Sequence, residues 1–175
     1  MIGRPRMEKD PQQVARLAEK RRDENWRFRS FLKMLSRRRQ REVNRIAEQY
    51  GLEAESRIDC RECGACCRDN AIPVSEEEIE RLAGRLGLSP DEVRAKYISH
   101  DEAEGDHIDA RPCPFLNGNL CSVYDSRPEG CRGYPYIGGD IATRTIGIIE
   151  RAGTCPIIFD MLERLKDAVG FRRYR

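Results

Sequence analysis

The chain has 175 residues, of which 35% are charged and 39% hydrophobic, a composition that suits one domain with an extension and excludes a wholly disordered chain. No apolar run approaches the roughly 20 residues that span a bilayer, and the start "MIGRPRMEKD" lacks the apolar stretch of a secretory signal, so we expect a cytoplasmic protein without a membrane segment. The net charge of +2 hides a basic arm: residues 1–50 hold 15 Lys and Arg against 7 Asp and Glu, and the remaining residues hold 17 against 23.

The basic arm is predicted to be helical. Asp10 and Pro11 are typical of a helix start, and apolar residues recur at helical spacing over 28–35 and 43–50. This pattern fits one long helix, or two shorter helices with a break near residues 22–25. Gly51 is predicted to end the segment.

The rest of the chain is predicted to mix helices and short strands. The segment "CRECGACC" (60–67) is interrupted by glycine and is expected to be irregular. Two helices are expected over 74–98, because Ser75 with Glu78 and Ser89 with Glu92 have the spacing of capping boxes. "IATRTIGII" (141–149) indicates a strand, and a last helix should run from Pro156 to Gly170. We therefore predict a small α+β protein with a helical arm over 1–50 and a cysteine-cluster domain over 51–175.

Eight cysteines are the candidate metal ligands: Cys60, Cys63, Cys66, Cys67, Cys113, Cys121, Cys131 and Cys155. A reducing compartment favours metal binding or redox chemistry over disulfides for thiols this dense. His100 and His107 are secondary ligand candidates, more typical of solvated loop residues.

The spacing of the cysteines does not decide between zinc and an iron–sulfur cluster. Cys63 followed by Gly64 resembles the knuckle of a zinc ribbon. Three cysteines at two-residue intervals (60–66) also match the start of a ferredoxin run, whose distant fourth cysteine precedes a proline, as Cys113 and Cys155 do here. An iron–sulfur cluster is the favoured cofactor and zinc is the alternative.

The ordered motif "CRECGACCR" followed by "CPFLNGNLCSVYDSRPEGCRGYPY" resembles the CxxCxxCC cysteine-cluster family, a zinc- or iron-chelating domain. The resemblance spans about residues 58–156 and leaves the arm outside. It implies metal chelation, and it extends to flagellin lysine methylases, which share the cysteine pattern. The matching positions are Cys60, Cys63, Cys66, Cys67, Arg68, Cys113, Phe115, Leu116, Cys121, Val123, Tyr124, Arg127, Pro128, Cys131, Arg132, Tyr134 and Pro135.

Three arginines next to these cysteines, Arg68, Arg127 and Arg132, are candidate cofactor-binding residues. Four thiolates around Zn²⁺ or an oxidised [4Fe–4S] core carry a net charge of about −2, which neighbouring arginines would offset. Hydrogen-bond donors near sulfur also tune the potential of a cluster.

We therefore expect a metal–thiolate protein that carries an iron–sulfur cluster and acts in electron transfer or cluster-assisted modification, with an unidentified protein or redox partner. The alternative is a zinc-stabilised interaction module that binds nucleic acid through the arm. The basic residues of the arm have helical spacing, but carboxylates interrupt them, which favours packing over nucleic-acid binding; these residues are Lys33, Arg37, Arg38, Arg39, Arg41 and Arg45. No motif identifies a catalytic residue.

Overall fold

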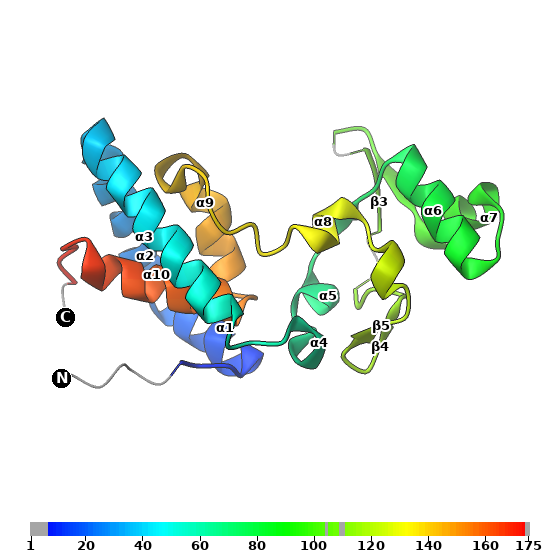
Figure 1. Cartoon of the computed structure of the whole chain (residues 1–175), viewed down its shortest axis with the longest axis horizontal. Helices are drawn as coiled ribbons and strands as arrows, with labels where there is room; N and C mark the ends of the chain where they lie inside the picture. The colour runs from blue at the N-terminus through cyan, green and yellow to red at the C-terminus, as the bar shows by residue number, and fades with distance from the viewer. Residues whose placement is uncertain (1–6, 104, 109–110, 174–175) are drawn as a thin grey trace. The chain divides into compact units, whose positions relative to one another are not determined.

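The computed structural model describes residues 7–103, 105–108 and 111–173. The chain forms two compact units, here named the helical unit (residues 1–59 and 135–175) and the cysteine unit (Cys60–Tyr134) (Figure 1). In the part of the chain that the structure describes, the helical unit consists of helices, and short antiparallel strands join helices in the cysteine unit. The predicted α+β class is confirmed.

The basic arm folds as α1 (Pro11–Lys20), α2 (Arg22–Met34) and α3 (Arg37–Glu55). Asp10 caps α1 by accepting a hydrogen bond from the backbone N–H of Gln12 at 2.9 Å. Helices α1 and α2 are separated at Arg21, close to the predicted break. A second break at Leu35 and Ser36, both in extended conformation, has no counterpart in the prediction; Ser36 caps α3.

Gly51 lies inside α3 and does not end the helix, so that prediction is wrong. A Cβ atom at this position would stand 2.5 Å from Cγ2 of Ile137, and real Cβ atoms essentially never approach other atoms so closely. Close packing against Ile137 therefore requires the glycine. The predicted boundary between arm and domain, at residues 50 and 51, also falls within α3; that functional division stays a prediction.

The predicted strand over 141–149 is also wrong, because this segment forms α9 (Ile141–Ala152). Its β-branched residues favour a strand by propensity. Two local features prevail: the Asp140 side chain accepts a hydrogen bond from the backbone N–H of Thr143, and the buried residues recur at helical spacing. The buried face consists of Ile141, Ala142, Thr145, Ile148 and Ala152.

The last predicted helix is confirmed as α10 (Pro156–Ala168), which forms the centre of the helical unit and packs on α3, α9 and α1. Its fully buried apolar side chains are Ile157, Ile158, Met161, Leu162 and Leu165. The same helix also buries the cation of Lys166, whose Nζ lies 2.7 Å from Oε1 of Glu24 and 2.6 Å from Oε1 of Glu163. Arg21 and Arg173 pair with Glu163 as well.

In the cysteine unit, α6 (Glu76–Leu86) and α7 (Pro90–Tyr97) stand beside an antiparallel sheet of order β1-β3-β2. The strands are β1 (Ile72–Pro73), β2 (Ser99–Asp101) and β3 (Gly105–Ile108). Both predicted capping boxes are present and complete.

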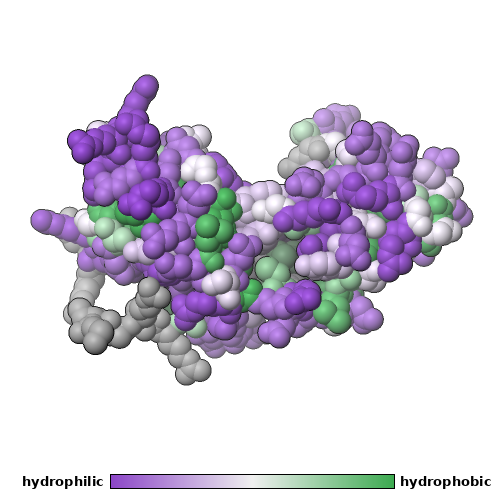
Figure 2. All heavy atoms as spheres, viewed as in Figure 1, coloured by the Kyte–Doolittle hydropathy of each residue, from purple (hydrophilic) through white to green (hydrophobic). Residues whose placement is uncertain are grey.

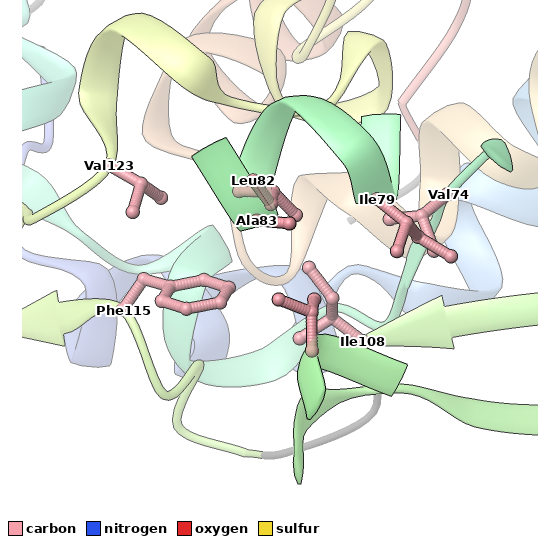
Figure 3. Close-up of a cluster of buried hydrophobic side chains, with 8 residues drawn as sticks. Val74, Ile79, Leu82, Ala83, Ile108, Phe115 and Val123 are labelled. Atoms are coloured by element: carbon pink, nitrogen blue, oxygen red, sulfur yellow. The ribbon is translucent and has the colours of Figure 1, made fainter. Parts of the chain in front are cut away.

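Apolar side chains from α6, β3 and the cysteine-bearing loops meet in one core (Figure 3). Figure 3 shows Phe115 and Ile108 turned toward Leu82 and Ala83 of α6. The buried members are Val74, Ile79, Leu82, Ala83, Val93, Ile108, Phe115 and Val123. The half-buried side chains of Cys113 and Cys121 pack against this cluster, so the core anchors the loops that carry them.

Short elements hold the cysteines themselves. The segment predicted to be irregular forms two single-turn helices, α4 (Cys60–Cys63) and α5 (Cys66–Asp69). Strands β4 (Leu116–Asn117) and β5 (Leu120–Cys121) form a hairpin, followed by the 3₁₀ helix η1 (Tyr124–Ser126) and by α8 (Glu129–Arg132). Among residues 7–103, 105–108 and 111–173, no helix is both long and apolar enough to traverse a bilayer.

Candidate metal centre

The first cysteine segment turns sharply between α4 and α5. Gly64 adopts φ of 59°, a left-handed conformation that glycine accepts without strain, and its N–H donates to the carbonyl of Cys60 at 3.1 Å. A Cβ atom at Gly64 would stand 2.7 Å from Nη1 of Arg68. The glycine therefore provides both the turn and the room for that guanidinium.

Arg68 joins this segment to the β4–β5 hairpin. Its Nη2 donates to the carbonyl of Gly118 at 2.7 Å and to the side chain of Asn119, and its Nη1 donates to the carbonyl of Cys63 at 3.4 Å. Asn119 in turn donates through Nδ2 to the carbonyl of Glu62. These bonds hold the hairpin tip against α4.

The backbone brings Cys67, Cys113 and Cys121 to one place. The N–H of Cys113 donates to the carbonyl of Cys67 at 2.8 Å, although 46 positions separate them in the sequence. Cys121 is paired with Leu116 across the hairpin, and the N–H of Leu116 donates to the carbonyl of Cys113 at 3.0 Å. Three cysteines from two distant segments therefore share one neighbourhood.

Cys131 approaches from a third segment. It lies on α8, where its N–H donates to the carbonyl of Pro128 at 2.9 Å. The Arg127 guanidinium stacks 3.6 Å from the centre of the Tyr124 ring, and Nε of Arg132 donates to the carbonyl of Arg127 at 2.9 Å. Arg127 and Arg132 thus brace the turn that leads into α8.

Cys67 is the acidic thiol of this group. A hydrogen bond from Cys66 lowers the pKa of Cys67 to about 6, against the opposing effect of burial and with further help from the charges of Arg127 and Arg68. The structure therefore favours a thiolate at Cys67.

The pKa values of the other three thiols are shifted upward. Burial is the main reason why the pKa values of Cys113 and Cys121 are raised, and the negative charge of Cys67 raises them further. Burial raises the pKa of Cys131 to about 12, with Cys67 again the next cause. The negative charge of Cys67 therefore raises the pKa of all three thiols, so the four cysteines form one electrostatic group.

The donor chemistry of this group fits a thiophilic metal. Four sulfurs meet the ligand number of a tetrahedral metal site or of a [4Fe–4S] cluster. A bound cation would favour the deprotonated form of each thiol, because coordination and proton loss are linked. Within the described residues, no three His, Cys, Asp or Glu side chains already stand in a geometry ready to hold a metal ion.

The remaining predicted ligands lie in different surroundings. Cys60 is exposed on α4, and Cys63 and Cys66 are half-buried on the two single-turn helices. Cys155 belongs to the helical unit, where it is buried at the N-terminal cap of α10.

Both histidines contact protein groups. Nδ1 of His100 lies 2.7 Å from Oδ1 of Asp106, and Nδ1 of His107 lies 2.9 Å from the carbonyl oxygen of Gly105.

Two of the three predicted arginines affect the pKa of a thiol. Arg68 and Arg127 both lower the pKa of Cys67. Arg132 bonds backbone carbonyls, so its part at the site is to position the turn. The sequence reasoning missed Asn119, whose only signal is its place beside Gly118 in the turn between two cysteines.

The comparisons with known proteins identify one family. Residues 59–156, more than half of the chain, match the profile of CxxCxxCC, described as "putative zinc- or iron-chelating domain". No curated protein and no solved structure matches the chain.

Proposed function

Because the chain belongs to the CxxCxxCC family, we propose that the cysteine unit binds a metal through thiolates, with Cys67, Cys113, Cys121 and Cys131 as the central ligands. The observation that carries the proposal is the hydrogen bond from the N–H of Cys113 to the carbonyl of Cys67, which, with the pairing of Leu116 and Cys121, brings cysteines from distant segments together. The packing of Cys113 and Cys121 against the apolar core supports this grouping.

The arginines complete the proposed site. A metal or cluster with four thiolates carries a charge of about −2, which is costly in a partly buried place unless cations lie nearby. Arg68 and Arg127 already act on Cys67, and Arg68 is fixed by hydrogen bonds to two loops. We assign them the roles of offsetting charge and of tuning the properties of the bound group.

An iron–sulfur cluster is the proposed cofactor, with electron transfer or cluster-assisted modification as the function. The cluster would supply one-electron chemistry when bound. In the cysteine unit the central thiols are only half-buried, which suits exchange of electrons with a partner protein, and Cys60, Cys63 and Cys66 add thiols at ferredoxin spacing. Zinc bound to the same four sulfurs is the alternative, and the unit would then be a metal-stabilised interaction module.

The test is metal analysis of protein purified without oxygen, with two cysteine variants as a matched pair. We expect iron and acid-labile sulfide with broad visible absorption in the unaltered chain. Cys131→Ser should lose most of the metal, whereas Cys155→Ser, in the helical unit, should retain it. Zinc without sulfide would select the alternative. Full metal retention in Cys131→Ser, or equal loss in both variants, would refute the proposed ligand set.

A further inference from the structure

A basic stripe faces solvent along the first turns of α3. It consists of four exposed arginines, Arg37, Arg38, Arg41 and Arg45. At about 100° per residue, these positions fall within an arc of about 100° around the helix axis. The stripe spans about 12 Å along the helix, at about 1.5 Å per residue.

Two carboxylates on α3, those of Glu42 and Glu48, lie near the stripe. In the described part of the chain, none of the four arginines has a salt bridge with them or with another residue. The nearest ion pair on the helix joins Arg39 and Glu42 at 2.6 Å, beside the stripe. Figure 2 shows hydrophilic side chains gathered over the end of the helical unit where α2 and α3 meet.

Folding alone does not explain this placement. The first turn of α3 contains no acidic residue, and its arginines sit at the end of the helix where backbone N–H groups already concentrate positive charge. Neighbouring like charges repel each other as well. Like charges at a helix start are unfavourable, and no contact inside the fold compensates for them here. Such a feature is more typical of a binding surface than of a structural one.

We propose that this stripe binds the phosphate backbone of nucleic acid. Each guanidinium offers a planar fork of donors that matches a phosphate. One strand of B-form DNA presents about three or four phosphates per 12 Å of duplex axis. The proposed contacts are to phosphates, which carry no sequence information, so we expect the binding to be independent of sequence.

A membrane surface suits the stripe less well. An amphipathic helix that lies in a bilayer interface inserts an apolar face into the lipid. The apolar face of α3 is occupied, because Val43, Ala47 and Ala54 are buried and the helix packs on α10. The nucleic-acid proposal does not depend on the metal site and can fail or succeed without it.

The first measurement is the affinity of the full-length protein for a fluorescent duplex of about 20 base pairs and random sequence, between about 50 and about 200 mM salt. With four phosphates neutralised, the slope of log affinity against log salt should lie near −3.6, which corresponds to a fall of about 100-fold over that range. A single strand should give a shallower slope near −2.8. Absence of binding to both nucleic acids at the lowest salt would overturn the proposal.

A matched pair of charge variants locates the surface. The stripe variant changes Arg37, Arg38, Arg41 and Arg45 to Gln. The control changes four exposed basic residues outside the stripe to Gln, and has the same net charge: Arg16, Lys20, Lys96 and Arg172. Circular dichroism should show both variants folded.

We expect the stripe variant to lose at least about tenfold in affinity and most of its salt slope, and the control to lose less than about threefold. Equal losses would show that bulk charge alone attracts the duplex and would overturn the assignment. Binding to vesicles with anionic lipid in preference to the duplex would also overturn it, in favour of a membrane surface.

Discussion

The Cys67 sulfur is chemically different from its neighbours, and alkylation should reveal it. With a pKa of about 6, most of this thiol is deprotonated at pH 7, whereas Cys131, with a pKa of about 12, stays protonated. In metal-free protein, iodoacetamide should therefore modify Cys67 before Cys131, with a rate that is half-maximal near pH 6. Peptide mass spectrometry over a range of pH measures this.

The Cys66 hydrogen bond is the first cause of the low pKa, so Cys66→Ala should move the midpoint of the Cys67 rate upward. A midpoint near the ordinary thiol value in the unaltered protein would contradict the prediction.

Lys166 is a buried cation whose removal should be costly. Burial alone raises the pKa of the Glu24 carboxyl, but the hydrogen bond and charge of Lys166, with Arg173 and Arg21, outweigh it and hold that pKa below its ordinary value. Lys166→Met leaves Glu24 and Glu163 without their central partner. We expect a loss of about 3 kcal/mol in the free energy of unfolding, measured by denaturant titration.

The exposed pair Arg39–Glu42 provides the comparison for Lys166. Arg39→Ala should cost less than about 1 kcal/mol, because exposed ion pairs contribute little. Equal losses in the two variants would show that burial of the Lys166 pair adds nothing.

At the scale of elements, sequence reasoning succeeds where the signal is local. The capping boxes at Ser75 and Ser89 and the start at Asp10 fix helix ends by hydrogen bonds between residues close in sequence. It failed for α9, because the β-branched composition indicates a strand, whereas the Asp140 cap and the helical spacing of the buried residues favour the helix that forms.

Gly51 and Gly84 occupy helix interiors for different reasons, so alanine should act on them in opposite directions. Gly51→Ala would force a Cβ atom against the stiff, branched Ile137, and should destabilise the helical unit by about 1–2 kcal/mol. At Gly84 in α6 a Cβ atom would meet nothing within 4 Å, and the better helix propensity of alanine should stabilise by up to about 1 kcal/mol. Thermal unfolding followed by circular dichroism tests both. The same sign for the two changes would contradict the packing account.

At the scale of the whole molecule, the cysteine motif located the cysteine unit in the sequence. The sequence did not indicate that residues 135–175 form one compact unit with residues 1–59. The contacts of α10 with α3 join segments about 100 residues apart, and no local pattern specifies such pairs. The same limit applies to the ligands. In the sequence, Cys60, Cys63 and Cys66 form a regularly spaced set. In the fold, Cys67 lies near cysteines from two later segments.

Because each unit has its own core, we expect the two units to unfold separately when the metal is removed. Trp26 is the chain's single tryptophan and lies on α2, so its fluorescence reports on the helical unit. Metal binding, by contrast, should stabilise the cysteine unit, where ligand closure orders loops that the small apolar core alone holds weakly. Stripping the metal, or the change Cys131→Ser, should lower the melting temperature of the cysteine unit by about 10 °C or more. Its transition is the one that circular dichroism detects and tryptophan fluorescence does not. The tryptophan transition should move by less than about 3 °C. If both transitions shift together by the same amount, the units fold as one cooperative body, and the metal then stabilises the helical unit as well.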